Sequence, residues 1–492
     1  MQFFASLLIL AALQGFLSTF NATAPAQSSL SAQASLSSAN LQPQDAALTT
    51  VRRQDREERG PDRKLPQLTI SEHLRRAKVY ADNRAFAEAR EHWQTLIERF
   101  PNDAAISAAL YGIGRSYFQE HLYEDALPVL QRLVNNYAST KDGREGLYSL
   151  ASTYLRLGRA TEAAEHYREY TQRYPQGERI EFAYLNVIDG WREAGRPALA
   201  IEWITRTRDL FRGTSTATNA LFARLRLDIA EGDWQHAVQT ADELRGASFT
   251  KDVMTNSQEV AYLKAYALER AGRTEEAINA YHAIPDRLDS YYGMLATDKL
   301  LSIKSAAAHP SITARVNRVQ SEAASASNQY PALYRESIVR AAASRKIDPR
   351  LVLAIMRQES GFRPRAKSPA AARGLLQLTV DTAQKYTARV GLNNLQDDDL
   401  YRPEISILVG SEYLSELMRL FPNLPEAVAA SYNGGEDNAA RWLKRAKRRD
   451  AGVFTAEVGF AETKNYVYKV MANYRAYRQL YTQDLRPRSA SN

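Results

Sequence analysis

One glutamate stands on the apolar face of a predicted helix. In the stretch LVLAIMRQESGF, Val352, Ile355, Met356 and Glu359 follow i, i+3, i+4, i+7 spacing, which places all four on one side of a helix. A glycine follows two residues later, so the glutamate lies in the last turn, near the negative end of the helix dipole. Burial and this dipole both raise the pKa of a carboxyl group. A carboxyl group that stays protonated near neutral pH is suited to general-acid catalysis.

The same glutamate also has a structural interpretation. Arg357, Arg363 and Arg365 flank it, and an arginine that folds inward would pair with the carboxylate and lower its pKa. A glutamate in this position can also cap a neighbouring helix. The geometry of this stretch alone therefore leaves a catalytic and a structural role open.

Cysteine and histidine are missing from the C-terminal third of the chain. The sequence has no cysteine. All seven histidines precede residue 331, namely His73, His92, His121, His166, His236, His282 and His309. A Ser-His-Asp triad, a Cys-His dyad and a metal site built on His or Cys are therefore excluded from this part. Acid–base chemistry there is confined to carboxylates, tyrosine and lysine, and we expect no metal and no cofactor.

Three further polar motifs follow the glutamate. GLLQL (374–378) places Gln377 among apolar residues after a glycine, and SYNGG (431–435) places Tyr432 and Asn433 beside a glycine-rich turn. ETKNYV (462–467) sets Glu462 and Tyr466 four residues apart on one helix face. Each motif alone is weak evidence for a ligand site.

Together, the four motifs resemble the catalytic domain of the soluble lytic murein transglycosylases. This family is assigned to glycoside hydrolase family 23, has a domain related to goose-type lysozyme, and typically shows E-S, G-L-M-Q-(L/I), A-Y-N-A-G and E-T-x-x-Y-V in this order. YPALY (330–334) and SYYGMLA (290–296) extend the resemblance.

The resemblance implies a role for each matching residue. Glu359 would be the single catalytic acid and base. The implied substrate contacts are Ser360, Gln377, Tyr432, Asn433 and Tyr466, and Glu462 would support the fold or the catalytic helix. Leu376 stands where the family usually has methionine and Gly434 where it has alanine, which bears on sugar contacts more than on activity.

The resemblance also resolves a shortage of carboxylates. Most glycosidases use two carboxylates. Here only one acid stands among the motifs interpreted as facing substrate, because we interpret the run Asp397–Asp399 as a solvated loop. In the implied reaction, Glu359 protonates the β-1,4 bond between N-acetylmuramic acid and N-acetylglucosamine of peptidoglycan, and the 2-acetamido group of the sugar stabilises the positive charge. The C6 hydroxyl then closes a 1,6-anhydro ring without water. Two alternatives remain open: a hydrolytic muramidase of the same fold, and an inactive repeat scaffold that binds glycan.

A helical repeat precedes these motifs. Alanines recur at a spacing of 37 residues, at positions 89, 126, 163, 200 and 237, and aromatic residues and glycines keep the same step. Small residues at helix contacts with this period predict a solenoid of helical hairpins that resembles tetratricopeptide repeats.

The expected fold is all-α, a tetratricopeptide-like superhelix followed by a lysozyme-like helical domain. The expected division is a signal peptide (1–26), a disordered linker (27–64), helical repeats (65–284), a helical connector (285–332), the catalytic domain (333–485) and a tail (486–492).

Charge and the apolar start bear on location and partners. The net charge of +8 is carried by the part after residue 331, which suggests an anionic polymer as partner, and RWLKRAKRR (441–449) is either its contact or a solvated helix face. The start of the chain predicts export to the periplasm or cell envelope, or a membrane anchor if it is uncleaved. We expect peptidoglycan as partner, other cell-wall enzymes as candidates for the repeats, and no nucleic acid.

Overall fold

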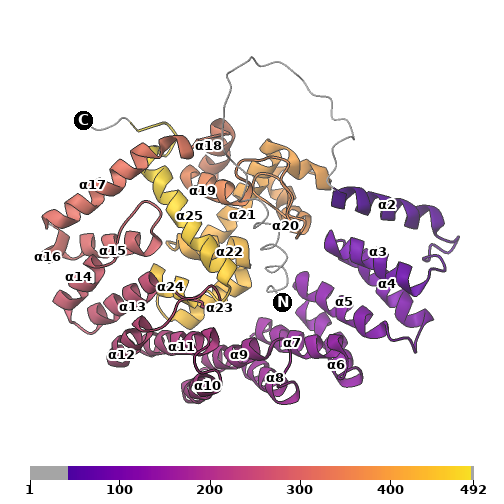
Figure 1. The fold of residues 1–492 in the computed structure, drawn as a ribbon. Coiled ribbons are helices and arrows are strands. Elements are labelled where there is room, and N and C mark those ends of the chain that lie inside the picture. Colours follow the sequence, from indigo (N-terminus) through magenta and orange to yellow (C-terminus); the bar gives the residue numbers. More distant parts are fainter. Residues whose placement is uncertain (1–42, 308, 489–492) are drawn as a thin grey trace. The chain divides into compact units, whose positions relative to one another are not determined.

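The computed structural model describes residues 43–307 and 309–488, and within them the chain is helical (Figure 1). The only extended pairings in these residues are two single bridges, Arg373 with Leu378 and Tyr481 with Pro487. The helices are α2 (Pro43–Glu58), α3 (Ile70–Asp82), α4 (Phe86–Arg99), α5 (Ile106–Gln119), α6 (Tyr123–Asn136), α7 (Lys141–Arg156), α8 (Ala160–Arg173), α9 (Ile180–Glu193), α10 (Pro197–Leu210), α11 (Ser215–Glu231), α12 (Trp234–Arg245), α13 (Ser257–Arg270), α14 (Thr274–His282), α15 (Tyr291–Ser302), α16 (Lys304–Ala307), α17 (Pro310–Ser325), η2 (Ser327–Gln329), α18 (Arg335–Ala343), α19 (Pro349–Ser360), α20 (Val380–Thr387), η3 (Ala388–Val390), η4 (Asp397–Tyr401), α21 (Pro403–Leu420), α22 (Pro425–Gly434), α23 (Glu436–Ala446), α24 (Ala451–Glu457) and α25 (Ala461–Leu480). The expected all-α fold is confirmed.

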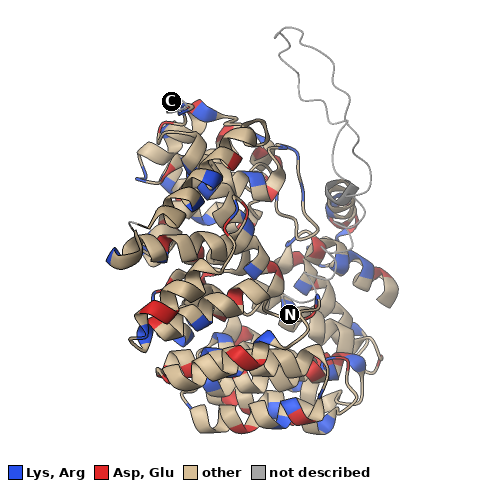
Figure 2. Ribbon diagram, turned by 60° about the vertical axis from the view of Figure 1, so that its left-hand side comes forward, with Lys and Arg blue, Asp and Glu red and all other residues tan. Residues whose placement is uncertain are grey.

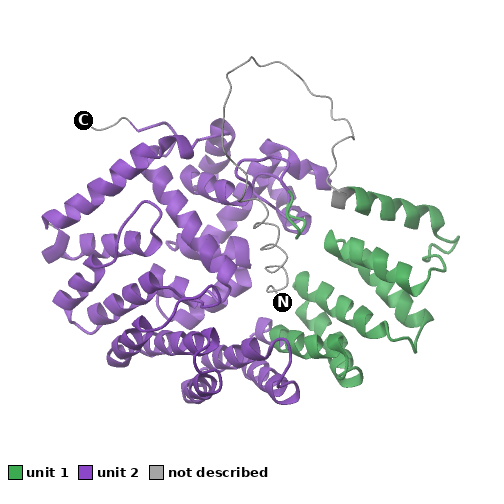
Figure 3. Cartoon of the chain, in the orientation of Figure 1, with its two compact units in different colours: residues 1–153, 367–372 green, residues 154–366, 373–492 purple. Residues whose placement is uncertain are grey.

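The chain forms two compact units (Figure 3). Unit 1 holds residues 1–153 and 367–372, and unit 2 holds residues 154–366 and 373–492. The later repeats, the connector and the C-terminal helices thus share unit 2. The predicted signal peptide lies outside the described residues, and none of the helices that the structure describes has the length and apolarity to span a membrane.

The repeat period corresponds to helix packing. The alanines at positions 89, 126, 163, 200 and 237 are fully buried, each in the second helix of a hairpin. A methyl group in these places lets the two helices of a hairpin approach closely. Gly158, Gly195 and Gly232 have φ values of 74°, 67° and 80° and occupy the turns between helices, as a left-handed position requires.

The predicted disordered linker is wrong for its second half. Helix α2 occupies residues 43–58, and Leu48 and Val51 are buried. Asp55 is also buried, and it accepts hydrogen bonds from Arg76 (2.5 Å) and Tyr80 (2.5 Å). The charged composition suggested a solvated segment, but its acid is paired inside unit 1. Residues 27–42 lie outside the described part, and Pro487 of the predicted tail pairs with Tyr481.

A histidine pair extends this buried network. Nδ1 of His73 lies 3.1 Å from Nδ1 of His92, and Nε2 of His92 lies 3.0 Å from Asp55. Burial raises the pKa of Asp55, but hydrogen bonds from His92, Tyr80 and Arg76 outweigh it and hold that pKa at about 2. Burial and the neighbouring positive groups lower the pKa of His73 from 6.5 to about 4. In the folded state, His73 of this pair therefore stays neutral at any pH above about 4.

We expect unit 1 to lose stability between pH 6.5 and pH 4. In this window the unfolded chain binds a proton at residue 73 and the folded chain does not, so the free energy of unfolding falls with pH by about 2–3 kcal/mol. Hydrogen exchange of peptides from α2 to α4, measured at several pH values, reports the loss. The variant His73→Leu should flatten this dependence and His121→Gln, an exposed control, should not. An unchanged slope in His73→Leu would contradict the assignment.

Candidate active site

Helix α19 places Glu359 at the centre of the candidate site. The helix begins at the N-cap Asp348, whose side chain accepts from the Arg350 amide (2.9 Å), and it ends at Gly361 with φ 55°. Its inner face is fully buried, and Glu359 is partly exposed in the last turn. The hydroxyl of Tyr466 on α25 donates to Oε1 of Glu359 at 2.6 Å. Tyr466, predicted as a substrate contact, is therefore in direct contact with the predicted acid.

The surroundings of Glu359 favour its protonated form. Burial raises the pKa of the Glu359 carboxyl from 4.5 to about 8, the hydrogen bond from Tyr466 opposes this rise, and the negative charge of Glu462 adds to it. None of the flanking arginines forms an ion pair with the carboxyl. Arg357 donates to Gln329 O, and Arg363 donates to Ser360 O at 3.0 Å. The group can therefore carry a proton at neutral pH, as a general acid must.

The GLLQL segment forms a tight loop that is hydrogen-bonded to α22 through Tyr432. Gly374 has φ 80°, and a Cβ atom at this position would lie 1.9 Å from Leu400 O, so only glycine fits. The Gln377 amide nitrogen donates to Ala366 O (2.9 Å) and Gly374 O (2.8 Å). Gln377 thus stabilises the loop through its amide group. Leu376 is fully buried, so its difference from methionine concerns packing.

The SYNGG segment ends α22 and joins the loop to α25. The Tyr432 hydroxyl donates to Leu376 O at 2.7 Å, and its ring lies 5.2 Å from the ring of Tyr413. Burial and the charge of Glu359 raise the pKa of Tyr432 well above its usual value. Asn433 accepts a hydrogen bond from Thr463 (2.6 Å). Tyr413 stands in no distinctive motif and carried no sequence signal, whereas Thr463 belongs to ETKNYV but was given no role of its own.

Ser360, one of the predicted substrate contacts, is buried in the structure. Its side chain is 1% exposed, and its hydroxyl donates to Met356 O at 3.2 Å. A helix residue one position after Glu359 is rotated by about 100° away from it, here into the core. Glu462 is partly exposed in the first turn of α25 and acts on Glu359 through its charge.

Of the three aspartates at 397–399, Asp398 is exposed as expected, whereas Asp397 and Asp399 have structural contacts. All three form the first residues of η4, and Asp399 accepts from the Gln396 amide at 2.9 Å. Asp397 lies 3.4 Å from Arg373, whose side chain is buried next to the GLLQL loop. Asp397 thus pairs with the residue that precedes the loop, and Asp399 stabilises the start of η4. No group of His, Cys, Asp or Glu in the described residues could hold a metal ion.

A cavity of about 570 Å³ adjoins the end of α19. Its lining includes Gln358 and Gly361, on either side of the Glu359 turn, with Arg357, Phe362 and Lys469. It combines aromatic rings with two cationic groups and Asp289, and Glu359 is not among its lining residues.

The densest basic segment is used inside the molecule. Arg441 pairs with Glu193 (2.9 Å), and Arg445 pairs with Glu457 (2.7 Å) and with Asp189 (3.2 Å). Lysine and arginine (blue) are interspersed with aspartate and glutamate (red) along the helices in Figure 2. The interpretation of residues 441–449 as a polymer contact or a solvated face is therefore wrong for these two arginines, because acidic residues of α9 and α24 pair with them.

Comparison with family models supports three of the four motifs, and ETKNYV (462–467) lies beyond the matched residues. Residues 336–454 match the transglycosylase SLT domain, and residues 74–139 and 111–178 match the tetratricopeptide repeat. The chain is 33% identical over 160 residues to the soluble lytic murein transglycosylase of Salmonella typhimurium, covering 32% of this chain and 24% of that protein. It is 33% identical over 160 residues to the membrane-bound lytic murein transglycosylase C of Salmonella arizonae, covering 28% of this chain and 44% of the relative. The match to the former thus spans about a quarter of that relative's length.

Solved structures give weaker likenesses. An inactive mutant of the lytic transglycosylase Slt from Pseudomonas aeruginosa aligns with a TM-score of 0.46 and 16% identity, covering 89% of this chain and 86% of that one. The 70 kDa soluble lytic transglycosylase of Escherichia coli aligns with a TM-score of 0.44 and 17% identity, covering 89% and 88%. The family matches confirm the resemblance found in the sequence: the chain carries an SLT domain preceded by tetratricopeptide repeats.

Proposed function

We propose that the protein is a peptidoglycan lytic transglycosylase that cleaves the β-1,4 bond between N-acetylmuramic acid and N-acetylglucosamine. The observation that carries this proposal is the Glu359 carboxyl, whose pKa burial raises to about 8 within an SLT domain. Such a group is protonated when substrate arrives, and it can donate to a glycosidic oxygen.

In the proposed reaction a single carboxyl group acts twice. Protonated Glu359 donates to the glycosidic oxygen, the C1–O bond breaks, and the 2-acetamido group of the muramic acid stabilises the positive charge at C1. The ionised carboxylate then accepts the proton of the C6 hydroxyl, and O6 attacks C1 to close the 1,6-anhydro ring. The Tyr466 hydroxyl, 2.6 Å from the carboxyl, stabilises the anion between the two steps. Protons balance, since Glu359 ends as it began.

The remaining site residues receive narrower roles in this proposal. Tyr432, Asn433, Gln377 and Tyr466 border the reacting sugar, and Gln377 does so while its amide nitrogen holds the loop. Ser360 would contact substrate only after a rearrangement of α19. We also propose the division into repeats (65–284), connector (285–332) and catalytic domain (333–485), with action on the glycan strands in the periplasm and protein partners on the repeats.

The product separates the lyase from its nearest alternative. Mass spectrometry of digested peptidoglycan should find 1,6-anhydromuramic acid ends. Reducing ends would instead identify a hydrolytic muramidase, in which water reaches C1. Absence of any new ends, with glycan still bound, would identify an inactive binding scaffold.

Glu462→Gln should shift the pH profile of the reaction. Its charge raises the pKa of Glu359, so the neutral amide lowers that pKa. The alkaline limb of the kcat/KM profile, where Glu359 loses its proton, then shifts to lower pH by roughly 0.5 to 1 pH unit. Initial rates of muropeptide release between pH 5 and pH 10 measure the limb. A limb that stays in place, with normal folding, would show that Glu462 does not act on Glu359 through its charge.

A further inference from the structure

Helix α25 separates Glu359 from the last repeats of unit 2. Tyr466 lies on the side that faces α19, where it donates to the catalytic carboxyl. Lys464 and Tyr468 are spaced i, i+4 on the other side of the helix. The ring of Tyr468 lies 5.2 Å from that of Tyr291 on α15. One side of the helix thus serves the site, and the other contacts the elements that precede the catalytic domain.

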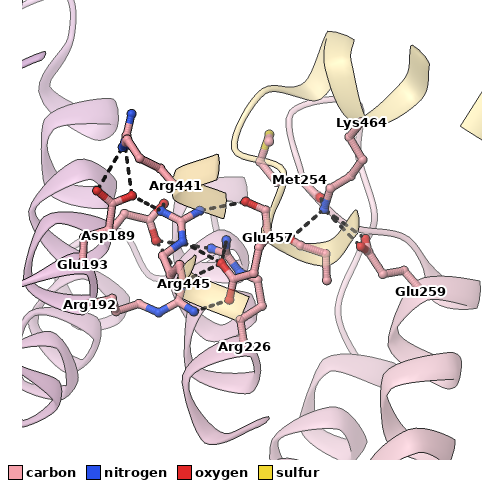
Figure 4. A network of polar contacts seen from close by, with 11 residues as sticks. Asp189, Arg192, Glu193, Arg226, Met254, Glu259, Arg441, Arg445, Glu457 and Lys464 are labelled. Carbon is pink, nitrogen blue, oxygen red and sulfur yellow. Dashed lines mark hydrogen bonds and ion pairs between the residues drawn. The ribbon is translucent and has the colours of Figure 1, made fainter. Parts of the chain in front are cut away.

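Lys464 is fully engaged by these elements. Its ammonium group donates to Met254 O (2.8 Å), Glu259 Oε1 (3.1 Å) and Ala456 O (3.2 Å), as Figure 4 shows for Met254 and Glu259. It also lies 4.7 Å above the ring of Phe222. An ammonium group has three N–H donors, so these three acceptors satisfy it completely. The acceptors come from the loop before α13, from α13 itself and from α24.

Glu259 is the counter-ion that the repeats supply. Its side chain is 0% exposed, and Oε1 also accepts from the Tyr292 hydroxyl at 2.7 Å. A buried carboxylate and a buried ammonium are each costly when unpaired, so this pair strongly favours one position of Lys464. The other charged groups facing Lys464 are Arg226 and Glu457.

A second set of ion pairs fixes α24, which holds one of the acceptors of Lys464. Glu457, the last residue of α24, pairs with Arg192 and Arg226 of the repeats and with Arg445 of α23 (Figure 4). Ala456, whose carbonyl binds Lys464, is the neighbouring residue. The start of α25 is therefore held from two directions by the repeats of unit 2.

We propose that Lys464 is a positioning residue for the catalytic carboxyl, with Glu259 of the repeats as its required partner. Lys464 fixes the first turns of α25, and this places the Tyr466 hydroxyl at hydrogen-bond distance from Glu359. The repeats then complete the catalytic site in addition to any role in binding partners. The inference rests on the proposed function, because its readout is the reaction that Glu359 catalyses.

A double-mutant cycle with Tyr466→Phe tests the proposal in the full chain. Tyr466→Phe removes a hydrogen bond that lowers the pKa of Glu359, so the alkaline limb of kcat/KM should move to higher pH. Lys464→Met should move the limb in the same direction and lower kcat roughly 10- to 100-fold, with little change in KM. The double variant should be no slower than the slower single variant, since both act through the same hydroxyl. Additive losses with an unmoved limb would overturn the proposal.

A second variant separates positioning from stability. Lys464→Met leaves the Glu259 carboxylate buried without its cation, and Lys464→Met/Glu259→Gln removes that charge while keeping an acceptor for Tyr292. We expect this double variant to regain thermal stability and remain slow. Recovery of rate together with stability would show a purely structural role and overturn the proposal. Lys444→Met, at an exposed lysine of α23, is the matched control. Wild type without anhydro products would instead refute the proposed function.

Discussion

Glu359→Gln is expected to lower the rate of peptidoglycan cleavage by at least about two orders of magnitude. The amide keeps the size of the side chain, and its oxygen can still accept from Tyr466, which lies 2.6 Å away in the wild type. It has no proton to give to the glycosidic oxygen and cannot accept one from the C6 hydroxyl. Release of soluble muropeptides from purified sacculi, followed by chromatography, measures the loss.

The same variant should be more stable than the wild type at alkaline pH. The pKa of Glu359 is about 8 in the folded chain and 4.5 without burial, so ionisation favours the unfolded chain as pH rises from 4.5 to 8. Glutamine does not ionise, so the variant keeps the free energy of unfolding that the wild type loses, a few kcal/mol at pH 8. Urea unfolding at pH 5 and pH 8 should show a gain in Glu359→Gln at the higher pH only. Glu404→Gln, at an exposed glutamate of α21, should change neither rate nor stability. Full activity of Glu359→Gln would refute the proposed chemistry.

The position of Glu359 was predictable because helical periodicity is local. Spacing alone placed the acid in the last turn of a helix with an apolar face, and Gly361 marked the end of that helix, as the structure has it. The approach of Tyr466 was different. Its hydroxyl comes from a residue 107 positions later, and only the resemblance to a known family placed it in the site.

Orientation within a motif was less predictable than its presence. The resemblance gave Ser360 and Gln377 as substrate contacts, but one is buried and the other uses its amide group on the loop. A motif specifies which residues occur at a site. Which of their atoms stay available depends on backbone carbonyls such as Met356 O and Ala366 O, which no residue type reveals.

Pairing between distant charges was not predictable from the sequence. Arg441 and Glu193 are 248 residues apart, and Asp55 and His92 are 37 apart. In both cases a charged segment resembled a solvated surface or a linker, because composition records the charge and not its partner. Arg441 and Arg445 of the basic segment, and helix α2, were misjudged for this shared reason.

Of the single substitutions proposed for stability measurements, Glu457→Gln should lower the free energy of unfolding most. Glu457 is 1% exposed, and it pairs with the guanidinium groups of Arg192, Arg226 and Arg445, so the amide removes one of the two carboxylates that these buried cations share and leaves them Asp189. Breaking a buried ion pair from one side costs about 3–5 kcal/mol. Urea unfolding of the full chain at pH 7 should show this loss. Arg208 and Glu243 form an exposed ion pair, so Glu243→Gln is the matched control and should change the free energy of unfolding by less than about 0.5 kcal/mol.

The pH dependence of that loss gives an independent check on its cause. Burial raises the pKa of Glu457, but the three arginines outweigh burial and lower it from 4.5 to about 2. The carboxylate therefore stabilises the folded chain above pH 4.5, and this contribution disappears as pH falls toward 2. The difference between wild type and Glu457→Gln should narrow between pH 5 and pH 3. A difference that stays constant over this range would assign the loss to packing and not to charge, and would remove the ion pairs from their role in holding α24 to the repeats.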